Sequence, residues 1–264
     1  MKILITADYE GASGHVQWGS GGEREAVTAD INAAIVGAID GGATEILVGE
    51  AHGNKRNIIP EALDPRALFL SGQPRPLNHL SGLDSTFDAV MFVAFHSKAG
   101  TLRGIMAHTS SSKVFSLKFN NIEVGELGTD TAIAGYFGVP VIMVTGDRAA
   151  CDEAHALLGD VETVAVKEGV SRSAGKCIHP IEARKLIKEG AKRAMSLIGT
   201  AKPFVIEPPI CTEIVFIDPT CADNLEYLSF IKRIDGRTVT YTTDDFIQAF
   251  ELYYMLQSYA GSVK

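Results

Sequence analysis

The sequence predicts an α/β fold, with a mostly parallel central sheet flanked by helices and a smaller α+β elaboration at its C-terminal end. Three observations predict it. Short apolar runs alternate with stretches of helical periodicity. Hydrophobic residues make up 46% of the 264 residues, and 26 glycines suit many tight strand–helix turns. We expect the main α/β domain to cover residues 1–200 and the elaboration 201–264, with one large domain as the alternative.

Five apolar runs predict the strands of the central sheet. These strands cover Ile3–Ala7, Glu45–Val48, Ala89–Ala94, Pro140–Val144 and Glu162–Ala165. A helix fits between the first two strands, because apolar residues recur there every four positions and therefore share one face. The residues of that face are Val27, Ile31, Ile35 and Ile39.

The later elements follow from alternation and helical period. Residues Lys113–Val124 alternate on both sides of Asn120-Asn121, which predicts a β-hairpin. The helices are expected at Glu126–Tyr136, Asp147–Leu158, His179–Ile198 and Asp244–Tyr259, and two further strands at Cys211–Ile217 and Arg237–Thr242. The apolar face of the last helix is Phe246, Phe250, Tyr253 and Leu256.

Charge and composition argue against several classes of protein. The net charge is −8, and without a basic stretch neither nucleic acid nor an anionic membrane is an expected partner. No apolar run approaches the roughly 20 residues of a membrane span, and the N-terminus is a poor secretory signal. The four cysteines form no C-x-x-C pair, so we expect reduced, mostly buried thiols in a cytoplasmic protein. A Cys211–Cys221 disulfide is the alternative.

Carboxylates and imidazoles gather where the predicted strands end. They are Asp8 and Glu10 after the first strand, Glu50 and His52 after the second, His96 after the third, His108 in RGIMAHTS and Glu126 in EVGELGTD. Singly, each has an ordinary explanation: a structural histidine, a helix cap, or a charge at a helix N-terminus. Because ligands collect outside the carboxyl ends of parallel strands, their coincidence on five segments indicates a metal site.

The number of candidate ligands indicates more than one ion. One catalytic zinc needs about three protein ligands, and this set is larger. It suits two divalent ions about 3.5–4 Å apart that share a carboxylate. Mixed imidazole and carboxylate ligands favour Zn²⁺, with manganese or iron as alternatives. Asp8, a short side chain at a rigid strand end, is the expected bridge.

Seven short segments carry a resemblance to a known family. They are Asp8–Gly14 (D-x-E-G-x-S-G), Ala51-His52, Phe95-His96, Met106–Thr109, Val124–Gly128 (V-G-E-L-G), Pro140–Asp147 and Ser171–Cys177. Together they resemble the motifs of the zinc-dependent D-aminopeptidases of the bacterial dipeptide-transport type. The likeness runs from the first residue to about Pro180, and more loosely through the final helix.

The resemblance implies a site and an assembly. It implies two zinc ions bound by Asp8, Glu10, His52, His96 and Glu126, with Asp8 shared between them. His108 would be the active-site group, described in the family as a nucleophile; a general base or an oxyanion stabiliser are the chemical alternatives. Family members assemble as decameric rings, so a homo-oligomer is expected.

Two departures from the family pattern fall where substrate would bind. The family pattern has Asp at the position of Glu50 and Leu-Asn at Thr129-Asp130. We therefore expect Glu50 and Asp130 to contact substrate, with Glu50 or one of the ions holding its free α-amine. Asp130 and Asp147 are also candidates to orient a metal ligand, although a helix cap is the better interpretation of Asp147.

The predicted function is metal-dependent hydrolysis of the N-terminal amide bond of short peptides that contain D-amino acids. One alternative is a di-metal hydrolase of another bond, such as a phosphoester, although no P-loop cradle is present. Another is a non-catalytic assembly protein with structural metals. A nucleotide-binding domain is disfavoured, since Gly11–Gly14 follows two acids that would repel a pyrophosphate.

Overall fold

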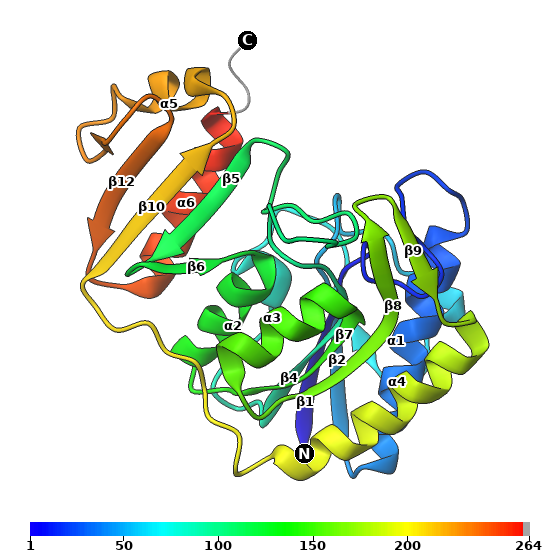
Figure 1. Ribbon diagram of the computed structural model, residues 1–264. Coiled ribbons are helices and arrows are strands. Elements are labelled where there is room, and N and C mark those ends of the chain that lie inside the picture. The colour runs from blue at the N-terminus through cyan, green and yellow to red at the C-terminus, as the bar shows by residue number, and fades with distance from the viewer. Residues whose placement is uncertain (261–264) are drawn as a thin grey trace.

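A seven-stranded sheet forms the centre of the computed structural model, which describes residues 1–260 (Figure 1). Its order is β3-β2-β1-β4-β7-β8-β9. The strands are β1 (Lys2–Ala7), β2 (Glu45–Glu50), β3 (Leu68–Phe69), β4 (Ala89–Phe95), β7 (Val141–Asp147), β8 (Glu162–Ser171) and β9 (Ala174–Cys177). Every neighbouring pair is parallel except β8 and β9, which form an antiparallel hairpin. The predicted fold class is confirmed.

Helices cover both faces of this sheet, and each face has its own apolar core (Figure 1). On one face α1 (Glu23–Asp40) packs against α4 (Pro180–Ala194), which a short 3₁₀ turn at Met195–Leu197 extends. Val27, Ile31 and Ile35 are buried there, as their spacing predicted. The other face holds α2 (Glu126–Tyr136) and α3 (Arg148–Leu158).

A second, antiparallel sheet packs beyond α2, in the order β11-β12-β10-β5-β6. Its strands are β5 (Val114–Phe119), β6 (Ile122–Val124), β10 (Ile210–Phe216), β11 (Lys232–Arg233) and β12 (Thr238–Thr243), accompanied by α5 (Pro219–Leu225) and α6 (Phe246–Ala260). The predicted hairpin is β5–β6, and both turn residues, Asn120 and Asn121, have positive φ. The predicted apolar face of α6 is buried.

The second sheet contains the hairpin from within residues 1–200, so residues after 200 do not build it alone. One buried cluster also joins β4 and α2 to β10 and α6. A domain division at residue 200 therefore remains a prediction, and it would cut a continuous sheet. Two 3₁₀ turns, at Pro60–Ala62 and Asn78–Leu80, lie in the long connection before β4.

The cysteines and helices bear on two further predictions. All four cysteines, which lie within the described residues, are free, so the alternative Cys211–Cys221 disulfide is wrong. Cys151 and Cys221 are buried. Cys177 and Cys211 are exposed, because they lie on solvent-facing positions of the antiparallel strands β9 and β10.

Over residues 1–260, no helix combines the length and apolar character that a membrane crossing requires.

The topology gives this sheet a natural binding edge. From β1 the chain moves to β2 on one side, and it later returns to β4 on the other side. The order of strands thus reverses at β1, and their carboxyl ends open a crevice there. Asp8, His52 and His96 closely follow these three strands.

Candidate metal centre

The loop after β1 carries two acids and lies directly against the end of β4. The N–H of Gly11 donates to the carbonyl of Ala94 at 2.8 Å. A Cβ at Gly11 would lie 2.2 Å from the backbone oxygen of Phe95, so only glycine allows this approach. The close contact fixes Asp8 and Glu10, which are buried, beside the end of β4.

Lys167 holds the same loop from the side of β8. Its buried ammonium donates to the carbonyl oxygens of Glu10 (2.5 Å), Ala12 (2.9 Å) and His15. Burial lowers the pKa of Lys167 to about 8. Three hydrogen bonds donated by one side chain make the loop rigid. Nothing in the sequence around Lys167 indicated this role, because it depends on a contact across more than 150 positions.

Asp8 lies between two histidines and turns a different oxygen to each. Its Oδ1 is 3.5 Å from Nδ1 of His52, and its Oδ2 is 3.4 Å from Nε2 of His96. Nδ1 of His52 also lies 3.1 Å from Oε2 of Glu10. The structure therefore brings these four predicted residues together, with Asp8 in the middle.

Glu126, at the first position of α2, closes the cluster on the far side. Its Oε1 lies 3.3 Å from Nε2 of His96 and 3.4 Å from Nε2 of His108, and it accepts from the N–H of Ser110 at 2.9 Å. The hydroxyl of Tyr253, on α6, in turn donates to Oγ of Ser110 at 2.8 Å. The second sheet and its helix thus support one wall of the site.

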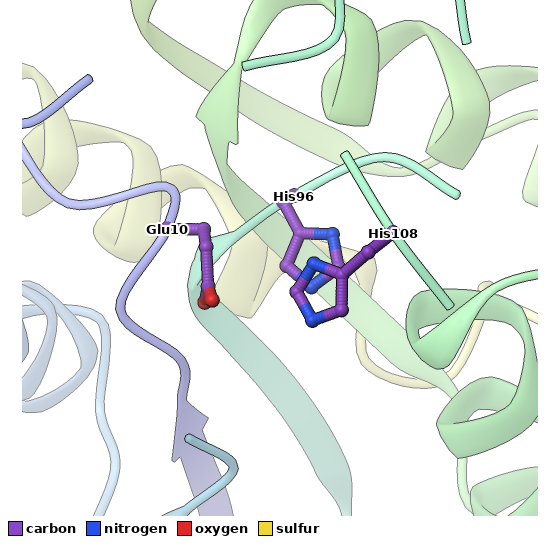
Figure 2. Close-up of side chains that lie close together, drawn as sticks. All are labelled: Glu10, His96 and His108. Atoms are coloured by element: carbon purple, nitrogen blue, oxygen red, sulfur yellow. The ribbon is translucent and has the colours of Figure 1, made fainter. Parts of the chain in front are cut away.

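Figure 2 shows His108 and His96 stacked face to face, with the carboxylate of Glu10 to one side of the two rings. The ring centroids are 4.1 Å apart and the planes differ by 13°. Nδ1 of His96 lies 2.9 Å from the carbonyl of Ser97, and Nδ1 of His108 lies 2.9 Å from the carbonyl of Met106. A carbonyl can only accept, so both rings are protonated at Nδ1 and leave Nε2 directed at the carboxylates.

The charged groups in this cluster shift one another's pKa values. Burial, together with the charge of Glu10, raises the pKa of Asp8. Burial alone would also raise the pKa of Glu126, but His96 outweighs it and lowers that pKa. For His52 burial acts downward, yet hydrogen bonds to Asp8 and Glu10 raise its pKa to about 10. His52 and His96 are therefore the cations that neutralise the acids when no metal is bound.

The donor set fits divalent metal ions. Three groups of side chains each bring their ligand atoms within 4.8 Å of one another: Asp8, Glu10 and His52; Asp8, His96 and Glu126; and Glu10, His96 and His108. Two ligand atoms, Oδ2 of Asp8 and Nε2 of His96, are buried without a hydrogen-bond partner among residues 1–260. Buried polar atoms normally have a partner, and a cation between these two would supply one. Carboxylate oxygen and imidazole nitrogen are ligands that zinc prefers.

A cavity of about 540 Å³ opens onto this cluster. Asp8, Glu10, His52, His108 and Glu126 line it. Sequence reasoning missed several further lining residues, which lie in loops without a periodic signal or on the last helix: Trp18, Lys55, Asn78, His79, Arg172, Tyr254 and Gln257.

Trp18, one of these additions, contacts two of the predicted site residues directly. Its indole N–H donates to Oε1 of Glu10 at 2.7 Å, and its ring meets His108 edge-on at 5.9 Å between centroids. The guanidinium of Arg172 lies 5.1 Å from the indole. Trp18 thus orients one candidate ligand while 44% of it stays exposed at the cavity.

Glu50, the last residue of β2, does not join this cluster. Its carboxylate accepts from the backbone N–H groups of Asn57 (2.5 Å) and Ile58 (3.3 Å), and Glu50 does not line the cavity. This carboxylate therefore stabilises the loop at Asn57 and Ile58 and does not face the cavity. We therefore do not retain Glu50 as a substrate-binding residue.

The two other acids have clear partners. Asp130 is buried and pairs with His79 at 2.8 Å, so it reaches the cavity only through that ring. Asp147 accepts from the N–H of Ala150 at 3.0 Å at the start of α3, and the preferred interpretation as a helix cap is confirmed. Its second oxygen accepts from the N–H of Ile105 at 2.7 Å.

This chain is similar to known proteins of one family. The family model described as D-aminopeptidase matches residues 1–255. A D-aminopeptidase of Bacillus subtilis is 37% identical over 217 residues, covering 79% of this chain and 78% of that protein. The solved structure of the Zn-dependent D-aminopeptidase DppA from Bacillus subtilis, a self-compartmentalizing protease, matches with a TM-score of 0.96 at 32% identity. That match covers 100% of this chain and 99% of the other. The chain belongs to the D-aminopeptidase family.

Proposed function

We propose that this protein is a zinc-dependent aminopeptidase that removes the N-terminal residue from short peptides containing D-amino acids. The observation that carries the proposal is the position of Asp8 between two histidines. One of its carboxylate oxygens faces His52 and the other faces His96. This arrangement suits a carboxylate shared by two ions. Family membership supports the choice of peptide as substrate.

Five side chains would hold the ions in this proposal. Asp8, Glu10 and His52 would bind one ion, and Asp8, His96 and Glu126 the other. When bound, such ions polarise a scissile carbonyl and lower the pKa of a coordinated water to about 7. Two other side chains position these ligands. Lys167 fixes the loop that carries Asp8 and Glu10, and Trp18 orients Glu10.

His108 is proposed as the proton-transfer group. Its Nδ1–H donates to the carbonyl of Met106, which leaves the lone pair of Nε2 directed into the site. Nε2 can therefore accept a proton from the attacking water and return it to the leaving amine. Its stacking on His96 keeps the ring in place through both transfers.

We extend the proposal to the assembly and the location of the protein. The relative DppA is described as self-compartmentalizing. By that likeness we propose a homo-oligomer for this chain, a decameric ring as the family resemblance implies. We further propose that the protein acts in the cytoplasm, on short peptides and without nucleic acid or membrane partners.

Metal analysis combined with a substrate screen tests the proposal. We expect two zinc ions per chain, and faster release of alanine from D-alanyl than from L-alanyl dipeptides. Asp8→Ala should lower the zinc content more than any other single change, because both ions lose a ligand. Glu182→Ala, which removes an exposed acid paired with Lys185, is the matched control. Hydrolysis of p-nitrophenyl phosphate but of no peptide would refute the peptidase assignment.

A further inference from the structure

A further buried histidine faces the cavity beside Glu126. His79 lies in the 3₁₀ turn Asn78–Leu80, far in sequence from every strand end that supplied a candidate ligand. Only 6% of the residue is exposed, and it lines the same cavity as Asp8 and Glu126. The roles proposed so far leave it without a function.

Asp130 fixes the orientation of this ring. Its Oδ2 lies 2.8 Å from Nδ1 of His79. Glu126 and Asp130 are four residues apart on α2 and therefore share one face of that helix. A carboxylate can only accept, so the contact holds the proton on Nδ1 and leaves Nε2 free to bind another group.

The backbone of His79 is held as firmly as its ring. Its carbonyl accepts from Oγ1 of Thr6 at 3.0 Å. The two preceding residues, Leu77 and Asn78, have φ of 54° and 43°, a left-handed conformation that is costly for leucine. Such strain persists only where surrounding contacts impose it, and it is concentrated at functional sites.

Nε2 of His79 faces an oxygen that it does not reach. It lies 3.9 Å from Oε2 of Glu126, which is beyond hydrogen-bond distance. Oε1 of Glu126 is already surrounded by His96, His108 and the N–H of Ser110, whereas Oε2 faces His79. Two acceptors at this spacing can share a single nitrogen donor placed between them.

We propose that His79, positioned by Asp130, binds the α-amino group of the substrate together with Oε2 of Glu126. This inference rests on the proposed function, because an aminopeptidase substrate carries a free amine on the residue that is released. The amine offers several N–H donors and can satisfy both acceptors. Glu50, expected from the sequence as one candidate to hold this amine, does not line the cavity, and its carboxylate binds backbone N–H groups instead.

Two substrates that differ only in the amine test the proposal: D-alanyl p-nitroanilide and propionyl p-nitroanilide. In His79→Leu we expect kcat/KM for the D-alanyl substrate to fall about 10- to 100-fold, the effect of one hydrogen bond to a charged group. The propionyl rate, measured with excess enzyme, should stay unchanged, as should the zinc content. His79→Gln, which places an amide oxygen near the position of Nε2, should recover part of the loss. His155→Leu removes an exposed histidine on α3 and serves as the control.

The outcomes separate three explanations. Equal losses on both substrates would make His79 a structural residue and overturn the proposal, and so would loss of zinc, which would make it a ligand. A wild-type protein that is active on D-alanyl substrate, with a His79→Leu variant of unchanged preference, would overturn the assignment of His79 alone. A wild-type protein inactive on every peptide would refute the proposed function, and this inference with it.

Discussion

Adding zinc to the metal-free protein at pH 7 should release protons, because the same imidazoles that would bind metal hold protons in its absence. Burial acts to lower the pKa of His52, but hydrogen bonds to Asp8 and Glu10 outweigh it and raise that pKa to about 10. Burial acts in the same direction at His96, where contacts with Glu126 outweigh it and raise the pKa well above the usual value. A metal ligand must be neutral imidazole, so binding expels these protons.

The two imidazoles should account for about two of the protons released per chain. With a pKa of about 10, His52 is protonated at pH 7, and His96 is protonated as well. Because protons are products of binding, the apparent affinity for zinc rises with pH. Its logarithm should increase by at least about two per pH unit near pH 7 when both ions have bound.

Isothermal titration calorimetry in two buffers of different ionisation enthalpy measures the released protons directly. His52→Gln should release about one proton fewer than the wild type, while Glu182→Gln, at an exposed ion pair, should release the same number. Zinc binding without proton release, and with an affinity that does not change between about pH 6 and 8, would refute the reasoning.

The same pKa shift has a consequence for folding. A group whose pKa is raised in the folded state adds stability at low pH. In the metal-free protein, the contribution of His52 should be complete below about pH 6.5 and lost as the pH rises through about 10. Zinc should reverse this trend, since it favours the neutral ring.

Three substitutions test other parts of the structure. His108→Ala should keep both zinc ions and lose at least about 100-fold in kcat, and loss of an ion would instead make His108 a ligand. Trp18→Phe removes a 2.7 Å hydrogen bond to a proposed ligand and should weaken zinc binding about 10- to 100-fold. Trp18 is the one tryptophan of the sequence, so wild-type fluorescence should respond to zinc; an unresponsive wild type would contradict the contact. Gly135→Ala places a Cβ 1.8 Å from a backbone oxygen and should cost about 1–3 kcal/mol in thermal unfolding. Gly236→Ala, whose Cβ meets no described atom within 4 Å, should cost far less, and equal effects would contradict the packing argument.

Much of the site could be predicted because parallel strands deliver their ends to one edge. Asp8, His52 and His96 each follow a strand of the central sheet, so knowing the strands is enough to expect them together. Glu126 and His108 were predicted from their motifs, but their meeting depends on the hairpin β5–β6 and the loop before it. The sequence pattern did not reveal that this hairpin joins the later strands in a second sheet.

The remaining side chains depend on contacts that no local pattern encodes. His79, Trp18 and Lys167 act through partners 51, 8 and 157 positions away. Glu50 illustrates the opposite case, since it ends β2 but two nearby N–H groups bind its carboxylate. Strand periodicity predicts the position of a residue in the sheet, whereas the hydrogen-bond partner of its side chain depends on how the loops fold.

The hydrogen bond from Tyr253 to Ser110 limits how this candidate metal centre could be transferred to another scaffold. Every proposed ligand lies in the first half of the polypeptide, so an engineer could be tempted to excise that half as a minimal catalyst. Such a fragment would lack α6, and Ser110 would lose the hydroxyl that supports it next to Glu126. A transferred site must therefore include α6 together with the proposed ligands.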